Sequence, residues 1–349
     1  MSPARQLPRT RGSLVATFML VSAIAASTAA CGAASEAQTV RMGYFANVTH
    51  APALIGVTEQ FFAAELGDDV DLQLSTFNAG PDAITALFSG ALDMSFIGPN
   101  PAINGFAQSD GQAIRIVAGT TSGGAALVVR PGVTSPGDLV GTRIATPQLG
   151  NTQDVALRSW LMDQGLTADL EGGGDVSVLP QSNAQTLETF RSGDIDGAWV
   201  PEPWATRLVL EGGGVVLVDE RDLWPGGRFV TTHLIVRTEF LDQHPDLVLD
   251  VLRGLVRAID FIEAEPDQAR AETNLAIEQI TGKALPAETI AAAWANLTFT
   301  VDPVAESLYV SADHAVAVGL LEPIDLAGIY ALDLLDQVLT ELGRPPVGQ

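Results

Sequence analysis

Three loops of the sequence combine glycine, asparagine or hydroxyl side chains with the start of a predicted helix, at residues 78–81, 98–101 and 150–153. The first N–H groups of a helix have no partner within the helix and carry a partial positive charge, so they can bind an anion. Glycine lets the backbone approach a ligand closely. The loops therefore predict an anion site. Their candidate ligand-binding residues are Gly80, Pro99, Asn100, Asn151 and Thr152. Alternatively, these residues are ordinary helix caps.

Two further segments carry candidate polar residues. One follows the first predicted strand, and the other precedes a pair of glycines. Asn47, Thr49 and His50 come directly after that strand, where ligands of open α/β sheets bind. His50 alternatively caps the helix that follows. Thr121 and Ser122 stand just before two glycines and offer hydroxyl and N–H groups. The same segment equally suits a flexible hinge.

The segment Trp-Val-Pro-Glu-Pro-Trp at residues 199–204 concentrates aromatic, acidic and rigid residues in one loop. Its two prolines restrict the backbone. We expect Trp199 or Trp204 to pack on the apolar part of a ligand or to make a cation–π contact. The alternative for each tryptophan is packing in the core. Glu202 lies between the prolines and is the carboxylate candidate of the site.

The net charge limits the classes of partner. The chain has 18 Lys and Arg against 42 Asp and Glu, a formal charge of −24, which argues against nucleic acid and against an anionic lipid surface. Anion binding does not require excess positive charge. Each hydrogen bond to a charged group contributes about 1.5–3 kcal/mol, and a micromolar ligand needs about 8 kcal/mol. Salt also screens distant charges beyond about 8–10 Å.

Short apolar runs alternate with helical patterns along most of the chain, which predicts mainly parallel sheets covered by helices. The predicted strands are residues 40–45, 70–77, 94–98, 114–119, 126–130, 143–146, 176–179, 198–200, 215–218 and 233–236. From Pro245 onward the pattern is helical only.

An internal repeat indicates that the chain has two similar halves. Residues 89–97 are matched 103 positions later by residues 192–200, and each copy runs from a helix through a glycine turn into a strand. A proline-containing loop follows in both copies. Because ligands bind beyond the carboxyl ends of such strands, we expect two lobes whose loops, 98–101 and 201–204, face one cleft. Chance similarity of two common αβ units is the alternative.

The N-terminal segment has the features of an export signal. Basic residues are followed by an apolar stretch at 14–26, which is too short to span a bilayer. Small residues then lead to Cys31, the only cysteine, which resembles the lipidated cysteine of a bacterial lipobox, although Thr28 stands where leucine is usual. We predict a lipoprotein signal peptide at 1–30 and a tether at 31–38. An ordinary secretory signal is the alternative.

Several motifs in a fixed order carry a resemblance to a known family. They are Gly-Tyr-Phe at 43–45, Thr-His-Ala-Pro-Ala at 49–53, Phe-Asn-Ala-Gly-Pro at 77–81, Gly-Pro-Asn-Pro at 98–101, Ala-Thr-Pro at 145–147, Gly-Asn-Thr at 150–152 and Asp-Gly-Ala-Trp-Val-Pro-Glu-Pro-Trp at 196–204. This set resembles the nitrate/sulfonate/taurine group of solute-binding proteins of ABC importers.

The resemblance implies an α/β type II periplasmic-binding-protein fold with two lobes and a helical C-terminal extension. Lobe one would comprise 39–125 plus 236–349, and lobe two 126–235. In taurine-binding relatives an acidic residue resembles an amine clamp, and Glu202 fits that role here. The expected ligand is therefore a small organic anion or zwitterion, an aliphatic sulfonate or taurine.

The expected setting follows from this resemblance together with the N-terminal segment. The protein would be a monomer on the outer face of the cell membrane or in the periplasm, held by Cys31 alone, and would deliver its ligand to an ABC permease and its ATPase. No cofactor, metal or nucleic acid is expected.

Other functions of the same fold remain open. Nitrate, bicarbonate or a thiamine precursor are alternative ligands, and a sensory binding module is an alternative class. An enzyme of this fold, a pyrimidine synthase of thiamine biosynthesis, carries a cysteine-rich motif, whereas this chain has one cysteine and four scattered histidines. An enzyme is therefore not expected.

Overall fold

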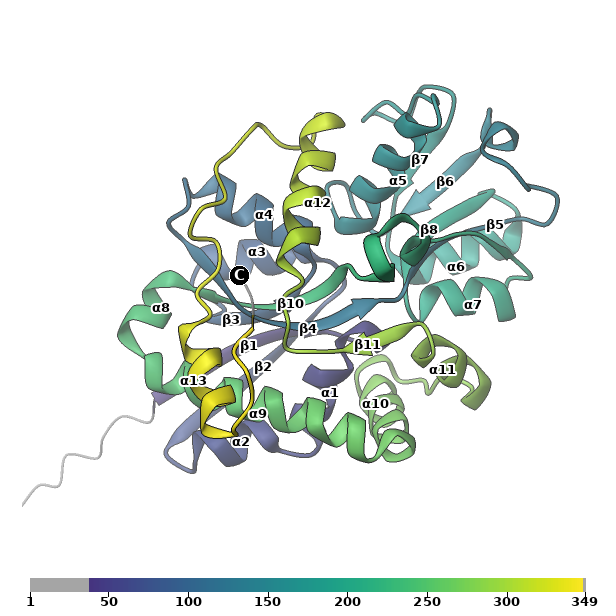
Figure 1. Ribbon diagram of the computed structural model, residues 1–349. Helices are drawn as coiled ribbons and strands as arrows, with labels where there is room; N and C mark the ends of the chain where they lie inside the picture. The colour runs from purple at the N-terminus through teal and green to yellow at the C-terminus, as the bar shows by residue number, and fades with distance from the viewer. Residues whose placement is uncertain (1–37, 348–349) are drawn as a thin grey trace, which may run out of the picture. The chain divides into compact units, whose positions relative to one another are not determined.

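The computed structural model describes residues 38–347, and these form two β-sheets flanked by helices (Figure 1). The predicted signal peptide, Cys31 and all but the last residue of the predicted tether lie outside the described residues. Within the described part of the chain, none of the helices is both long and apolar enough to cross a membrane.

The first sheet has six strands in the order β11-β4-β10-β3-β1-β2. Its strands are β1 (Gln38–Phe45), β2 (Val70–Phe77), β3 (Met94–Ile97), β4 (Ile114–Gly123), β10 (Val230–Arg237) and β11 (Leu297–Phe299). Strand β1 pairs in parallel with β2 and β3, whereas β10 is antiparallel to both β3 and β4.

The second sheet has five strands in the order β7-β6-β8-β5-β9. Its strands are β5 (Ala125–Val129), β6 (Arg143–Thr146), β7 (Ser177–Pro180), β8 (Gly197–Pro201) and β9 (Val215–Asp219). Here β6 is parallel to β7 and β8, and β5 is antiparallel to β8 and β9. Apart from β11, the two sheets therefore share one plan, in which a fourth, antiparallel strand lies beside a parallel trio.

In each sheet, the antiparallel strand is the first strand that the chain forms after it crosses from the other sheet. Strand β4 ends at Gly123 and β5 begins at Ala125, so the chain passes from the first sheet to the second through one residue. It returns between β9 and β10.

The internal repeat is also visible in the hydrogen bonds. Asp93 accepts from the N–H of Arg41 at 2.9 Å, and Asp196 accepts from the N–H of Arg143 at 2.8 Å.

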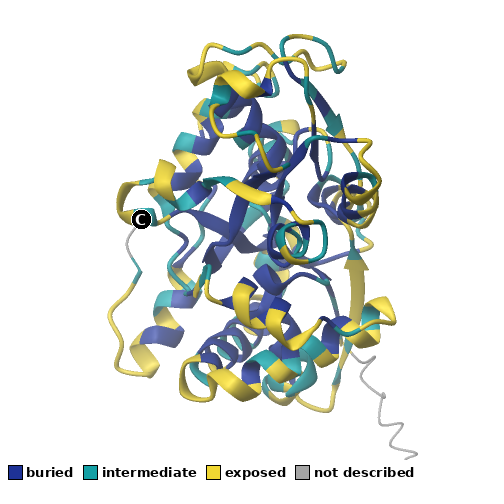
Figure 2. Cartoon of the chain, turned by 90° about the vertical axis from the view of Figure 1, so that its right-hand side faces the viewer, coloured by how far each residue is buried: buried dark blue, intermediate teal, exposed yellow. Residues whose placement is uncertain are grey.

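Helices cover the sheets. They are α1 (Ala51–Thr58), α2 (Phe61–Leu66), α3 (Gly80–Phe88), α4 (Pro99–Gln108), α5 (Thr152–Asp163), α6 (Asn183–Ser192), α7 (Trp204–Leu210), α8 (Thr238–Gln243), α9 (Pro245–Ala264), α10 (Pro266–Thr281), α11 (Ala287–Trp294), α12 (Ala305–Ala317) and α13 (Asp333–Glu341). Short 3-10 turns lie at Val48–His50, Pro136–Leu139, Glu220–Leu223 and Pro225–Gly227. Buried residues concentrate in the strands and on the inner helix faces, while the outer faces are exposed (Figure 2).

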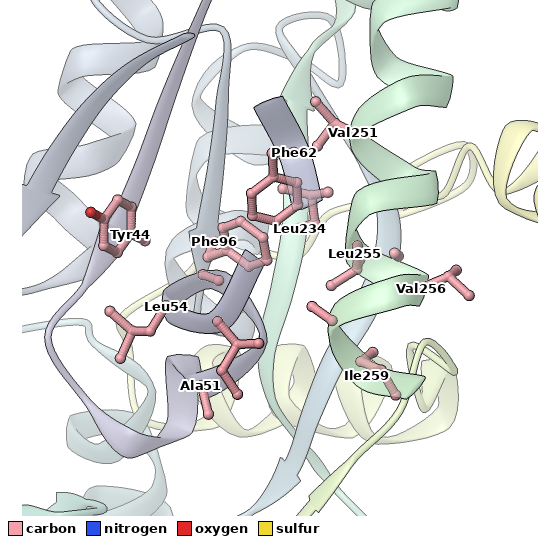
Figure 3. Close-up of a cluster of buried hydrophobic side chains, with 14 of the residues drawn as sticks. Tyr44, Ala51, Leu54, Phe62, Phe96, Leu234, Val251, Leu255, Val256 and Ile259 are labelled. Carbon is pink, nitrogen blue, oxygen red and sulfur yellow. The ribbon is translucent and has the colours of Figure 1, made fainter. Parts of the chain in front are cut away.

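The largest core cluster lies between the first sheet and helices α1, α2 and α9 (Figure 3). Phe62 of α2 is fully buried there, and its ring centroid lies 6.1 Å from that of Phe96 on β3. A Cβ at Gly56 would lie 2.2 Å from the Phe62 ring, and one at Gly254 would lie 2.7 Å from it. Glycine at these two helical positions therefore lets α1 and α9 close on one aromatic ring.

We expect Phe62→Ala to lower the free energy of unfolding by about 3–5 kcal/mol, because the surrounding helices can only partly fill the space left by the ring. Phe88→Ala is the matched control, since Phe88 is 43% exposed, and its loss should be much smaller. Urea denaturation of both variants measures the difference. Equal losses would show that the cluster closes around another residue.

Candidate functional site

A small cavity lies where the carboxyl ends of parallel strands from both sheets converge. Its volume is about 30 Å³, and we call it the inner cavity. Its lining residues are Phe45, Asn47, Thr49, His50, Asn78, Gly80, Gly98, Pro101, Pro147, Asn151, Thr152, Gln153, Asn183, Pro201 and Thr231. Both proline-containing loops of the internal repeat line this cavity, through Gly98, Pro101 and Pro201. Six of the predicted ligand-binding residues meet here: Asn47, Thr49, His50, Gly80, Asn151 and Thr152.

Several helices begin at the inner cavity. The residues at the starts of α1, α3, α4 and α5 make no side-chain capping hydrogen bond, and these residues are His50, Ala79, Gly98 and Asn151. Helix α6 also begins here, at Asn183, but Ser182 caps it. Four sets of first-turn N–H groups thus lack a side-chain cap, and such groups attract anions. Asn151 occupies the capping position of α5 without acting as a cap.

His50 offers the inner cavity a neutral hydrogen-bond donor. Its ring stacks on Phe45 with centroids 4.4 Å apart, and Nδ1 accepts from the N–H of Phe45 at 3.4 Å. Because Nδ1 is an acceptor, the proton of the neutral ring is on Nε2. Burial lowers the pKa of His50 to about 3, so the ring carries no charge near neutral pH.

Two buried polar atoms of cavity-lining residues have no hydrogen-bond partner among residues 38–347. They are Oγ1 of Thr152 and Oδ1 of Asn183, in side chains that are 5% and 8% exposed. A Cβ at Gly98 would lie 2.5 Å from Thr152 Oγ1, so glycine there leaves room around the hydroxyl. Buried polar groups rarely stay unpaired. These two atoms are therefore the natural partners of a polar ligand.

A buried ion pair shapes the loop that carries Asn151 and Thr152. Asp154 accepts from Thr146 Oγ1 at 2.8 Å, from the N–H of Gly150 at 3.0 Å and from Arg158 Nε at 3.1 Å. The side chains of Asp154 and Arg158 are 0% and 2% exposed. Asp154 thus ties the end of β6 to the start of α5. The sequence analysis did not single it out, although an acidic residue in the first turn of a helix is a recognisable signal.

We expect Asp154→Ala to destabilise the protein by about 3–5 kcal/mol, because Arg158 would stay buried without its partner. Asp163→Ala, at the exposed end of the same helix, should change the free energy of unfolding by less than about 0.5 kcal/mol. The double variant Asp154→Ala/Arg158→Met should recover part of the loss in chemical denaturation. A double variant as unstable as Asp154→Ala would contradict the role of the unpaired charge.

Trp199 does not reach the inner cavity. Its side chain is fully buried in the core of the second sheet, where its ring packs edge-on against Trp160 at 6.0 Å. Its Nε1 donates to Glu220 at 2.7 Å. Burial raises the pKa of Glu220 to about 7. The expected ligand contact is thus replaced by core packing, the alternative that the sequence left open.

Glu202 is also directed elsewhere. Its carboxylate accepts from the N–H and the hydroxyl of Thr206, at 3.1 and 2.9 Å, in the first turn of α7. It further accepts from Asn296 Nδ2 at 2.7 Å. Desolvation raises its pKa. Both oxygens are therefore engaged within the protein, and the carboxylate does not line the inner cavity, so the expected amine clamp has no support in this geometry.

Trp204 lies at the edge of the inner cavity and links the two sheets. Its Nε1 donates to Asn47 Oδ1 at 2.9 Å, and the guanidinium of Arg207 lies 4.6 Å from its ring centroid. It therefore fixes the side chain of a cavity-lining residue.

The remaining predicted residues support the site from behind. Thr121 Oγ1 donates to the carbonyl of Thr49 at 2.7 Å, and Asn100 Nδ2 donates to the carbonyl of Ser311 at 3.2 Å. Ser122 pairs with neighbouring strands in the first sheet, and Pro99 opens α4 beside Gly98.

Two lining residues lie outside every segment that the sequence analysis singled out. Asn183 follows β7 at the start of α6, and Thr231 lies on β10. Asn183 follows a strand just as Asn47 does, which was an available signal. None of the lining residues is lysine or arginine. Among residues 38–347, no group of His, Cys, Asp or Glu is arranged to hold a metal. The inner cavity therefore offers neutral donors.

Known proteins share the sequence pattern and the fold of this chain. Residues 33–277 match the sequence profile of the NMT1-like family. The taurine-binding periplasmic protein of Escherichia coli (strain K12) is 28% identical over 238 residues, which cover 67% of this chain and 70% of that protein.

Solved structures agree in fold. The alkanesulfonate-binding protein from Xanthomonas axonopodis pv. citri bound to MOPS matches with a TM-score of 0.67 and 22% identity, covering 83% of this chain and 96% of that chain. The periplasmic nitrate-binding protein from Synechocystis PCC 6803 matches with a TM-score of 0.69 and 17% identity, covering 88% and 89%. The predicted fold and the resemblance are confirmed, and these relatives are binding proteins rather than enzymes.

Proposed function

Because the chain belongs to the NMT1-like family, we propose that it is the solute-binding component of an ABC importer for a small organic anion, an aliphatic sulfonate or taurine. One observation carries the proposal: four helix N-termini without side-chain caps meet at a cavity that is lined by neutral donors. The taurine-binding and alkanesulfonate-binding relatives support the ligand class.

The proposed contacts use residues of the inner cavity. The anion's oxygens would accept from Thr152 Oγ1, from His50 Nε2 and from first-turn N–H groups beside Gly80 and Asn151. Hydrogen bonds to a charged group contribute about 1.5–3 kcal/mol each, so four of them reach the roughly 8 kcal/mol of a micromolar complex. Oδ1 of Asn183 is an acceptor without a partner among the described residues, and it would suit the amine of a zwitterion better than Glu202 does.

Nitrate and bicarbonate are second candidates. The inner cavity has a volume of only about 30 Å³, and so small a cavity favours a small planar anion. The nitrate-binding protein with the same fold is consistent with this choice.

The cellular setting is part of the proposal. The two sheets would be the cores of two lobes that close over the ligand by bending at the β4–β5 and β9–β10 connections. If the lobes follow the sheets, all of β10 would belong to lobe one, because β10 pairs within the first sheet, and the second boundary would lie ahead of residue 230. The closed protein would dock as a monomer on the ABC permease, which works with its ATPase. Lipidation of Cys31 would hold the protein at the outer face of the membrane.

A ligand panel tests the proposed function. A bound ligand at 100 times its dissociation constant stabilises the protein by about 2.7 kcal/mol, so thermal shifts should appear with methanesulfonate or taurine. Thr152→Ala should weaken binding by about 10- to 100-fold, since it removes one hydrogen bond to the anion, whereas Thr152→Ser should retain most of the affinity. Thr85→Ala, on the exposed side of α3, is the control.

The same panel should contain nitrate, bicarbonate and a pyrimidine. Stabilisation by pyrimidines alone would overturn the anion proposal, and stabilisation by nitrate alone would replace the sulfonate by the second candidate.

Binding should be nearly independent of pH between about pH 5.5 and about pH 8, because His50, the titratable group of the inner cavity, has a pKa lowered to about 3. The ring is neutral both before and after binding in this range, and a sulfonate does not titrate there. Isothermal titration calorimetry across the range measures the dissociation constant. A tenfold loss of affinity as the pH rises through about 6.5 would show that a charged imidazole holds the anion.

A further inference from the structure

A second, larger cavity adjoins the inner one. It has a volume of about 600 Å³, and we call it the outer cavity. Three asparagines, Asn47, Asn78 and Asn183, line both cavities. Trp204 lines the outer cavity and donates to Asn47 at the boundary. A ligand that reaches from one cavity into the other therefore passes these three side chains.

Apolar side chains from three parts of the fold line the outer cavity. Phe77 comes from the end of β2, and Trp204 from the start of α7. Ile277, Ile280 and Leu285 come from the end of α10 and the loop that follows it. The C-terminal helices thus add a third wall to the walls supplied by the two sheets.

Charged groups also line the outer cavity. Arg207 donates to both carboxylate oxygens of Glu211, at 2.7 and 3.3 Å. The hydrogen bond from Arg207 and the positive charge of Lys283 hold the pKa of Glu211 below its usual range, so this carboxylate is ionised. Lys283 is the only lysine of the chain. Two cations against one anion give the outer cavity a positive balance in a protein of net charge −24.

The two cavities differ in volume, so each suits a different part of a ligand. The inner cavity, at about 30 Å³, has room for a head group at most. The outer cavity, at about 600 Å³, lies within the roughly 300–1,000 Å³ range of sites for drug-sized ligands. Its apolar lining suits a hydrocarbon or aromatic body, and its positive balance does not oppose the negative charge of the ligand.

We propose that the outer cavity is a second subsite, which holds the apolar body of an organic anion whose head group lies in the inner cavity. The ligand class is therefore an alkyl or aryl sulfonate larger than taurine. This inference rests on the proposed function, because it takes the inner cavity as the anion site.

The test compares methane-, butane- and hexanesulfonate by isothermal titration calorimetry on the purified protein. Burial of each methylene in the outer cavity should tighten binding about fourfold, so affinity should rise steeply with chain length. Equal affinities for the three compounds would overturn the second subsite while leaving the proposed function intact. If none of the three sulfonates binds, the sulfonate function itself fails, and the second subsite fails with it.

A variant tests whether the hydrocarbon chain of the ligand binds in the outer cavity. Ala184 is an exposed residue of α6 that lines the outer cavity, so Ala184→Phe should fill part of this space and flatten the dependence on chain length. Gln185→Phe, one position further on the same helix and outside both linings, should behave like the unchanged protein. A steep dependence that survives in Ala184→Phe would place the hydrocarbon elsewhere and overturn the proposal.

Discussion

The exchange of one antiparallel strand between the two sheets is the constraint on which the site depends. It is made at Gly123 and Gly124, whose φ angles of 81° and 77° are unfavourable for other residues. A Cβ at Gly123 would lie 2.7 Å from the carbonyl oxygen of Asn296, and one at Gly124 would lie 2.1 Å from the side chain of Leu297. The tight passage lets β5 enter the second sheet at once, which brings the carboxyl ends of both parallel trios to one cavity.

The polar groups near this passage divide into two sets. On one side, Asn296 donates to Glu202 at 2.7 Å and accepts from Arg221 at 3.1 Å, so its amide joins α7 and the β9–β10 connection to the segment before β11. On the side of the inner cavity, Thr152 and Asn183 keep polar atoms without a partner among the described residues. The first set holds the fold together, whereas the second set supplies contacts of the proposed ligand site. This division explains why a buried carboxylate beside the cleft need not bind the solute.

The sequence predicted the framework more fully than the side-chain roles. Apolar, β-branched runs located all the strands except β11, whose three residues are too short for a periodic signal. The helical pattern of residues 51–65 did not show that α1 and α2 are separated at Gln60, which adopts φ 58°. Residues that directly follow a strand, such as Asn47 and His50, were found because topology alone sends strand ends to the cavity. The contacts of Glu202 and Trp199 could not be foreseen, because their partners, Asn296 and Glu220, are tertiary neighbours that no local pattern reveals.

The acidity of the chain and the recognition of an anion are compatible because they act over different distances. Surface carboxylates are screened within about 8–10 Å in salt, whereas first-turn N–H groups and a hydroxyl act at contact. A neutral set of donors also avoids the desolvation cost of burying a lysine or arginine, which is several kcal/mol per ion. The cations Arg207 and Lys283 lie instead in the larger cavity, where the ion pair between Arg207 and Glu211 offsets part of that cost. In the proposed site, local dipoles would select the charge of the ligand, and the surrounding walls would select its size.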